Sequence, residues 1–368
     1  MIEWVKTAKL VNHTQREILS IQMPQSSEKH ELIIDLHEDV AEYCMAEGER
    51  NKEFSKDIEG RQADFPKYKR AGVGIVVASL FPLIRTYNPE LSEQMTAMYG
   101  GGGIAYTAKA PTAIALEQLK IYSRMTETFP NTFHIIQHQT DLERSAREEQ
   151  LGFLICLEGT EPLEDPSDLE TFRKLGLRAI GLTWNYDTRY AASCMSKKDY
   201  GLTGDGEELV KKANEKGIIV DLAHSSKTTM LDVLNLTREP VMISHTNYAR
   251  VQPHARNTDD NVLEALKQNG GVIGFTFVTS TLGTNPELDT VTKHILSVQD
   301  RYGSDILAIG TDYLGISTTP TGLENIGKLP NLITRLADLG MNKRDIRKLT
   351  WENAYRVFKE NAKRWQTR

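Results

Sequence analysis

The amino-acid sequence predicts an α/β fold, a closed (β/α)8 barrel of the TIM type, with an insertion after its second strand and a helical C-terminal tail. Eight short runs rich in Val, Ile and Leu recur along the chain, and segments with helical spacing separate most of them. A length of 368 residues suits such a barrel with insertions. We therefore expect residues 1–368 to form a single domain.

Each of the eight runs is largely apolar throughout, as expected of parallel strands that are covered on both faces. The runs are ELIIDLH (31–37), VGIVVASLF (73–81), GFLICLEG (152–159), LRAIGLTW (177–184), GIIVDLAH (217–224), PVMISH (240–245), GVIGFTF (271–277) and DILAIGTD (305–312). Helices are expected at 207–216, 226–236, 259–268 and about 287–301, and in the tail at 331–339, 342–350 and 351–365.

The largest insertion spans residues 82–151 and includes the glycine run YGGGGIAY (99–106). This run does not lie between a strand and a helix with the spacing of a phosphate-binding loop, so it is expected to be a flexible loop. The insertion could cover a site or form the surface of a homodimer.

Charge and composition narrow the class of partner. The formal net charge is -6 and the sequence has no long basic run, which argues against nucleic acid and anionic membranes and favours a small-molecule substrate. The N-terminal residues lack the apolar core of a signal peptide, and no apolar run is long enough to span a membrane, so we expect a cytoplasmic protein. Three scattered cysteines do not predict a disulfide framework or a thiolate metal site.

Polar side chains end five of the eight runs, at the rim where barrels of this kind build their active sites. A single histidine at a strand end is more often a hydrogen-bonded structural residue than a ligand. Three histidines and three carboxylates that all lie at the C-terminal ends of their strands instead predict a shared site. The six residues are His37, Asp39, Glu158, His224, His245 and Asp312. Five other histidines are expected to be structural or on the surface: His13, His30, His134, His138 and His294.

Imidazole and carboxylate ligands without cysteine suit a catalytic Zn²⁺, Mn²⁺ or Fe²⁺. Six groups are more than one cation needs. Two divalent cations bridged by a carboxylate and a water would use them, with His37, Asp39 and Glu158 on one cation and Glu158, His224 and His245 on the other. Such cations lower the pKa of the water between them, so that hydroxide is available near neutral pH. Asp312 remains free to take the proton that this water loses.

The first run, IIDLHEDV (33–40), contains three carboxylates near its end. Strand alternation predicts that Asp35, His37 and Asp39 share one face while Glu38 points to the other. We therefore expect Asp39 to bind metal, Asp35 to act as a supporting carboxylate one layer deeper, and Glu38 to be dispensable for metal binding.

These residues resemble the renal or membrane dipeptidase family of zinc-dependent hydrolases, a branch of the amidohydrolase-like barrels, and look most like its bacterial members. The resemblance runs from about residue 31 to 360. His37-Glu38-Asp39 is similar to the family's His-x-Asp, Glu158-Gly159 to its bridging glutamate turn, Asp221–His224 to its "DLSH", and Gly310–Gly315 to its strand-eight motif. The most specific segment, 244–263, carries His245 and then the family's H-x-R-N turn as His254, Arg256 and Asn257.

The resemblance implies a binuclear dipeptidase that hydrolyses the peptide bond by attack of a metal-bridging hydroxide. Glu158 and Asp312 would be catalytic, and Arg256 would bind the terminal carboxylate of the substrate, which a guanidinium fork can hold bidentately. His254 would line the same pocket. Trp184 and Asn185 stand where mammalian members carry a substrate-binding histidine, so a metal ion or Asn185 would have to stabilise the oxyanion. Leu314 replaces a second acidic residue.

Two alternatives remain open. One is a related amidohydrolase that acts on N-acyl amino acids or lactones, although the better-known branches use His-x-His on the first strand and often a lysine on the fourth, neither of which is present. The other is a barrel that binds metal or ligand without turnover. The complete set of six rim residues argues against it, while Trp184 keeps it open.

Overall fold

The computed structural model describes residues 32–46, 53–82, 111–146 and 150–365. Within this part of the chain, the strands are β1 (Ile33–Glu38), β2 (Val73–Leu80), β3 (Phe133–Ile135), β4 (Leu151–Glu158), β5 (Leu177–Gly181), β6 (Ile219–Asp221), β7 (Met242–Thr246), β8 (Val272–Phe275) and β9 (Leu307–Ile309). All eight predicted runs are strands, which confirms the basis of the fold prediction. The short strand β3 was not predicted.

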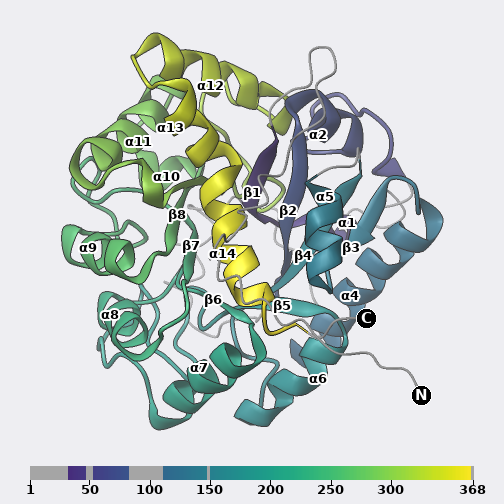
Figure 1. Cartoon of the computed structure of the whole chain (residues 1–368), viewed down its shortest axis with the longest axis vertical. Helices are drawn as coiled ribbons and strands as arrows, with labels where there is room; N and C mark the ends of the chain where they lie inside the picture. Colours follow the sequence, from purple (N-terminus) through teal and green to yellow (C-terminus); the bar gives the residue numbers. More distant parts are fainter. Residues whose placement is uncertain (1–31, 47–52, 83–110, 147–149, 366–368) are drawn as a thin grey trace, which may run out of the picture.

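Eight of the described strands close a parallel barrel. Around the barrel the strands follow the order β1, β2, β4, β5, β6, β7, β8 and β9. The last strand, β9, pairs back to β1 through Asp35 and Ile309. The strand β3 stays outside the ring, because it pairs only with the first residues of β4 while β5 pairs with the later ones. The predicted TIM-type barrel is confirmed, with helices around its strands (Figure 1).

The helices of the described residues are α1 (Val40–Ala46), α2 (Phe65–Ala71), α4 (Pro111–Thr128), α5 (Gln139–Ser145), α6 (Leu169–Lys174), α7 (Gly204–Lys216), α8 (Lys227–Leu236), α9 (Asp260–Asn269), α10 (Thr279–Leu282), α11 (Leu288–Tyr302), α12 (Leu329–Asp338), α13 (Lys343–Arg347) and α14 (Asn353–Ala362). Short helical turns are η2 (Pro166–Asp168), η3 (Ser304–Ile306), η4 (Ile326–Lys328) and η5 (Lys348–Glu352). Each predicted helix is present, with small shifts at its ends.

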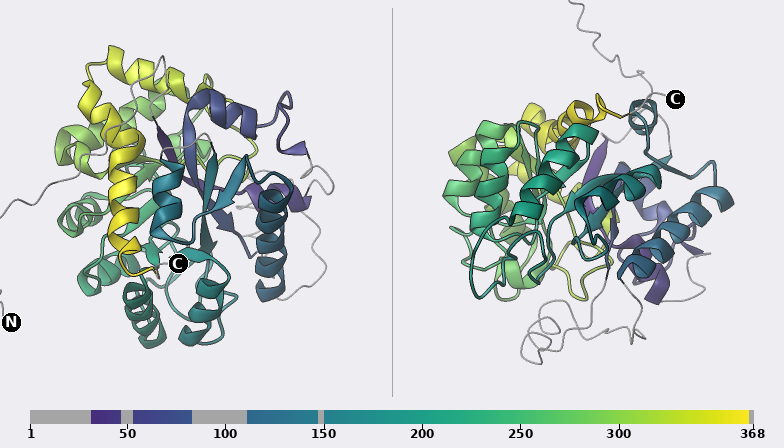
Figure 2. Two further views of the ribbon diagram at one scale, coloured as in Figure 1. Left: turned by 45° about the vertical axis from the view of Figure 1, so that its right-hand side comes forward. Right: turned by 90° about the horizontal axis from the view of Figure 1, so that it is seen from below.

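The helical tail closes one end of the barrel. Interior side chains such as Ile34 and Met242 belong to one apolar cluster with Phe358 of α14. The indole nitrogen of Trp365 donates to the carbonyl of Gly217, just before β6 begins, at 2.7 Å. This contact places α14 across the N-terminal end of the strands, and Figure 2 shows the helix in yellow at one end of the molecule. The C-terminal end is left for the site.

The insertion between β2 and β4 is partly a regular barrel unit. Helix α4 packs on β2, where the hydroxyl of Tyr122 donates to the carbonyl of Ser79 at 2.9 Å and the side chain of Gln118 binds both backbone groups of Phe81. The added elements are β3 and α5. The glycine run at 99–106 lies outside the described residues.

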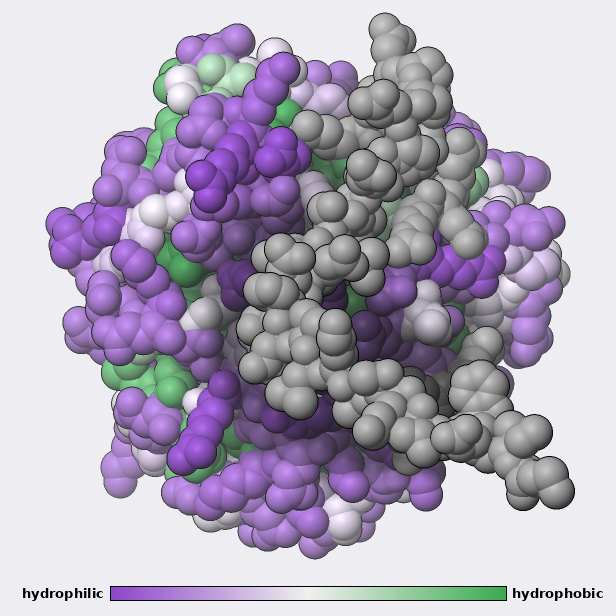
Figure 3. All heavy atoms as spheres, viewed as in Figure 1, coloured by the Kyte–Doolittle hydropathy of each residue, from purple (hydrophilic) through white to green (hydrophobic). Residues whose placement is uncertain are grey.

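Hydrophilic residues dominate the visible part of the face in Figure 3, with apolar residues in small groups between them. Among the described residues, the large apolar side chains that are exposed lie in separate segments: Leu116, Leu175, Tyr200 and Leu339. Among the helices that the structure describes, none has the length and apolar character that a membrane span needs.

Candidate metal centre

The six predicted rim residues meet at the C-terminal end of the barrel, and all are buried. The imidazole of His37 is the centre of one group: its Nε2 lies 3.6 Å from Oδ2 of Asp39 and 3.9 Å from Oδ1 of Asp312. Ligand atoms of these three residues lie within 4.8 Å of one another, and the same holds for His37, Glu158 and His245. These are two overlapping candidate metal sites.

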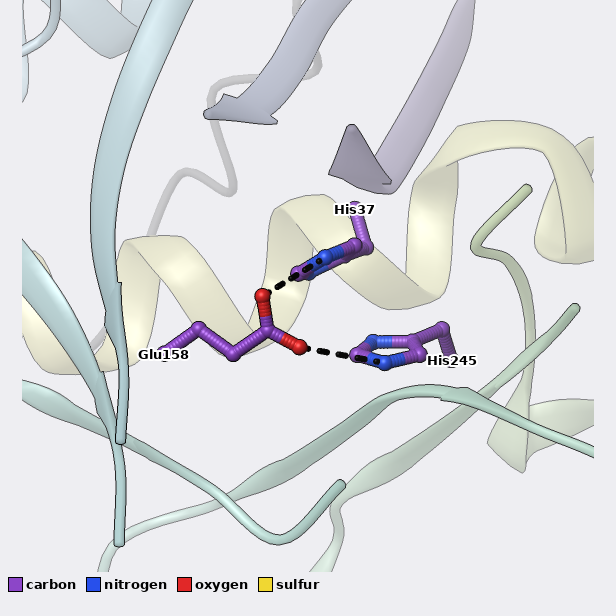
Figure 4. Close-up of side chains that lie close together, drawn as sticks. All are labelled: His37, Glu158 and His245. Carbon is purple, nitrogen blue, oxygen red and sulfur yellow. Dashed lines mark ion pairs between the residues drawn. The ribbon is translucent and has the colours of Figure 1, made fainter. Parts of the chain in front are cut away.

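Glu158 lies between His37 on one side and His224 and His245 on the other. Its Oε2 is 3.3 Å from Nε2 of His37, whereas its Oε1 is 3.1 Å from Nε2 of His224 and 3.6 Å from Nε2 of His245. Figure 4 shows the carboxylate between the rings of His37 and His245. One oxygen directed to each side is the geometry that a bridging carboxylate requires.

A register shift in β1 aims His37 into the site. Asp35 pairs with Val76 and Glu38 with Ala78, so β1 has one more residue than β2 over this stretch. Such a bulge reverses the alternation of side chains and re-aims one of them. Glu38 consequently points away from the site, where it accepts a hydrogen bond from the hydroxyl of Tyr68.

The predicted position of Asp35 on the face of His37 is therefore wrong. Its sequence neighbours Ile34 and Leu36 face the barrel interior, so Asp35 between them points the other way. Burial together with the charge of Asp35 raises the pKa of Glu38 well above its usual range. Asp35 still supports the site. Its Oδ1 accepts from the backbone N–H of His37 at 3.2 Å and of Thr311 at 2.9 Å, which fixes the end of β1 against the end of β9.

A second register shift, in β7, aims His245. Ile243 pairs with Ile273 but Thr246 pairs with Phe275, so the extra residue falls at Ser244 or His245. The carbonyl of Ser244 occupies space that two glycines leave open, because a Cβ at Gly310 would lie 1.7 Å from this oxygen and a Cβ at Gly274 1.9 Å from it. The bulge thus depends on the absence of side chains at Gly274 in β8 and at Gly310 directly after β9.

The carboxylate of Asp221 braces this second bulge as Asp35 braces the first. Its Oδ1 accepts from the backbone N–H of Ala223 at 3.0 Å and of Ser244 at 2.9 Å. Two residues that follow their strands, His224 with φ 63° and Asp312 with φ 67°, adopt the left-handed conformation. For residues other than glycine this conformation carries strain, and such strain collects at functional sites.

Two histidines are held in the neutral form, which is the form that can bind a cation. Nδ1 of His224 lies 2.8 Å from Oδ1 of Asn185, and Nδ1 of His245 lies 2.8 Å from Oγ of Ser244. The amide oxygen of Asn185 can only accept, so it fixes the proton of His224 on Nδ1 and leaves a lone pair on Nε2, the atom that a cation would bind. Burial and the charge of Arg256 lower the pKa of His224 to about 3, and burial also lowers the pKa of His245 well below its usual range.

The other side of the centre accumulates negative charge. Burial opposes protonation of His37, but the charges of Glu158 and Asp39 raise its pKa well above the usual range. Burial and the charges of Asp39 and Glu158 likewise raise the pKa of Asp312. In the described part of the chain, neither ring nitrogen of His37 nor Oδ1 of Asp39 has a hydrogen-bond partner.

The donor set fits divalent cations. Nε2 of His224 and Nε2 of His245 lie 2.8 Å apart, so one cation can bind both nitrogens once neither carries a proton. The unpartnered buried atoms of His37 and Asp39 are the ones that a cation on the other side would bind.

Arg256 lies beside the histidines. Its guanidinium is buried, and Nη2 lies 2.9 Å from Nε2 of His224 and 3.1 Å from the carbonyl of His245. His254 is half-buried, and its Nδ1 accepts from the backbone N–H of Arg256 at 3.1 Å, so it shapes the turn that carries the arginine. Its role in substrate binding stays a prediction.

Trp184 forms an aromatic wall over one side of the site. Its ring centroid is 5.0 Å from that of Phe81 and 5.9 Å from that of His224. Leu314, where the family motif has an acidic residue, adopts φ 72°, and its backbone N–H donates to the side chain of Gln62 at 2.7 Å.

Several residues of the site were not predicted. Ser79 of β2 donates to Oε2 of Glu158 at 3.0 Å, and a Cβ at Gly315 would lie 2.1 Å from Oδ2 of Asp39. Ser79 lies near the C-terminal end of β2, the end of the strand at which the six rim residues lie, so its position gave a signal. The contact of Gly315 with Asp39 gave none, because it joins two distant segments.

A closed parallel barrel with buried histidine and carboxylate ligands at its C-terminal rim defines the class of amidohydrolase-type metal-dependent barrels. The chain belongs to the membrane dipeptidase family (peptidase family M19), whose family model matches residues 25–368. The predicted family is confirmed.

Two curated relatives are fungal. The chain is similar to the dipeptidase tcpJ of Claviceps purpurea, with 31% identity over 250 residues, and to the dipeptidase verJ of Clonostachys rogersoniana, with 33% identity over 247 residues. Both matches cover 66% of this chain, but only 59% of tcpJ and 64% of verJ. The chain thus matches less than two thirds of the length of these relatives.

The fold is also similar to that of a metallopeptidase from Rhodobacter sphaeroides, whose crystal structure contains a phosphinate mimic of the dipeptide L-Ala-D-Ala. The TM-score is 0.79 and the sequence identity 23%, with 90% of this chain and 99% of that chain covered. At this identity the similarity concerns the fold.

Proposed function

We propose that this chain is a dipeptidase that uses two divalent cations, with Zn²⁺ as the best fit to its ligands. The divided carboxylate of Glu158, 3.3 Å from His37 and 3.1 Å from His224, is the observation that carries the proposal. His37, Asp39 and Glu158 would hold one cation, and Glu158, His224 and His245 the other. Cations at such a site polarise a carbonyl group and lower the pKa of water.

The protein residues supply the remaining functions. Arg256, buried and already fixed by the carbonyl of His245, binds the terminal carboxylate of the dipeptide as a planar fork. Asp312, whose pKa burial and its acidic neighbours raise, holds a proton at its carboxyl group and delivers it to the leaving amine. The aromatic wall of Trp184 excludes water from the adjacent side of the pocket.

The test is metal analysis of the purified chain together with a dipeptide panel, for wild type and Glu158→Gln. We expect two metals per chain and cleavage in wild type, and a loss of about a thousandfold or more in kcat/KM in the variant, since a metal contributes several kcal/mol to the transition state. Glu164→Gln, an exposed glutamate six residues further on, is the matched control and should behave as wild type.

Two bound metals without cleavage of any dipeptide would contradict the proposal. N-acyl amino acids and lactones would then be the next substrates to assay. Less than one metal per chain under metal-replete conditions would contradict the whole site.

Four finer expectations enter as proposals. Placement in the bacterial branch rests on Trp184 and Asn185, while the relatives named above are fungal. A cytoplasmic location is supported by three cysteines that are all free thiols, and cell fractionation would test it. Limited proteolysis would test the single domain over 1–368, and sedimentation would test a homodimer.

A further inference from the structure

Two carboxylates near the metal centre belong to neither group of ligands. Glu42 lies in the first turn of α1, three residues after Asp39, so the two side chains lie on one side of that turn. Burial and the charges of Asp39, Glu158 and Asp312 raise the pKa of Glu42 well above its usual range. Its position in the first turn after β1 places Glu42 at the rim that carries these three carboxylates.

Glu161 approaches from the loop after β4. Its carboxylate folds back over the backbone directly after Glu158, because a Cβ at Gly159 would lie 2.3 Å from Oε2 of Glu161. Gly159 has φ 94°, which permits this close approach. Oε2 of Glu161 is buried and has no hydrogen-bond partner, and an unpartnered carboxylate oxygen in a buried position requires a donor.

The two glutamates follow strands that lie across the barrel from the strand before Arg256. In the ring of eight strands, β1 and β4 flank β2, and β2 stands opposite β7. Glu42 follows β1, Glu161 follows β4, and Arg256 follows β7. Within the described residues, neither glutamate forms an ion pair or a hydrogen bond with another residue's side chain. The C-terminal rim therefore carries Arg256 after β7 and the two glutamates after β1 and β4.

We propose that Glu42 and Glu161 bind the free α-ammonium group of the substrate while Arg256 holds its carboxylate. This inference rests on the proposed function and deepens it, because it makes the zwitterionic dipeptide the preferred substrate over N-acyl amino acids of the same shape. An ammonium group carries three donors and fits two carboxylates, and a methyl group at that position would leave both carboxylates desolvated and unpaired.

The test compares one dipeptide that wild type cleaves with its des-amino analogue, in which hydrogen replaces the α-ammonium group. We expect wild type to prefer the dipeptide. In Glu42→Gln and Glu161→Gln, kcat/KM for the dipeptide should fall about tenfold to a hundredfold, mainly through KM, because a charge-assisted hydrogen bond is lost. The des-amino analogue should be hydrolysed as fast as before or faster.

Controls separate this role from metal binding and from folding. Both variants should retain the metal content of wild type, and Glu164→Gln should leave the substrate preference unchanged. If Glu161→Gln lowers the melting temperature, Glu42→Gln decides the question alone. An equal loss on both substrates, or no loss on either, would overturn the assignment while the dipeptidase proposal stands. If wild type cleaves no dipeptide, both proposals fall together.

Discussion

On one side of the metal centre, His224 and His245 each have Nδ1 at 2.8 Å from an oxygen of the protein, whereas on the other side, in the described residues, His37 has no hydrogen-bond partner for either ring nitrogen. We call the first the histidine side and the second, with Asp39 and Asp312, the carboxylate side. Protein contacts orient the histidine side before metal binds. The carboxylate side brings Asp39, Glu158 and Asp312 close to one imidazole, so we expect its geometry to depend on a bound cation.

The largest expected effect comes from removing a ligand on the carboxylate side. Asp39→Asn should reduce the metal content from two per chain to one and lower kcat/KM by about a thousandfold or more. Glu38→Gln, the neighbouring carboxylate that accepts from Tyr68, should retain both metals. Elemental analysis of the two variants checks this pair. If Glu38→Gln lost the metals and Asp39→Asn kept them, the register of β1 would be wrong.

The next effect tests whether the histidine side is oriented by the protein. Asn185→Ala removes the acceptor for Nδ1 of His224 and should weaken metal binding about 10- to 100-fold, the usual cost of losing such a partner. Asn185→Asp keeps an acceptor there and should retain the metal. Competition with a chromophoric chelator measures both affinities. Equal affinities for wild type and Asn185→Ala would show that His224 needs no orienting partner.

A smaller effect should come from the bulge in β7. Gly310→Ala places a methyl group against the carbonyl of Ser244, at 1.7 Å before any relaxation, and the barrel must shift. Overpacking of this kind costs about 1–3 kcal/mol of unfolding free energy. Gly204→Ala, where a Cβ meets nothing within 4 Å, is the control. Denaturant unfolding of both variants gives the comparison, and equal stabilities would mean that the bulge tolerates side chains.

The smallest effect concerns a buried histidine outside the centre. Nδ1 of His294 accepts from the backbone N–H of Tyr248, and burial, with the charge of Lys293, lowers the pKa of His294 from 6.5 to about 4. The unfolded chain therefore takes up this proton first as pH falls below 6.5. Stability should drop by about 2 kcal/mol between pH 7 and pH 5 from this group alone.

His294→Gln keeps an acceptor but does not titrate, so its melting temperature should change less over that range. If wild type and variant showed the same pH dependence, burial of His294 would not be the cause. The difference between wild type and His294→Gln also gives the part of the pH dependence that comes from His294. The part that remains in the variant comes from other groups, including those near the metal ligands.

The sequence was sufficient to predict the barrel and its six rim residues because strand ends of a parallel barrel converge on one rim. It did not predict the face of Asp35, because alternation holds only in a regular strand and the shift between Asp35 and Glu38 breaks it. The support that Asp221 and Gly310 give to the β7 bulge also depends on contacts between strands. Such contacts leave no periodic signal in the sequence.

Anomalous diffraction from crystals of the metal-loaded chain tests the central claim most directly. The account predicts two peaks, one on each side of Glu158: the first within bonding distance of His37 and Asp39, the second within bonding distance of His224 and His245. A single peak on the histidine side, with the carboxylate side occupied by no metal at saturating concentration, would contradict it.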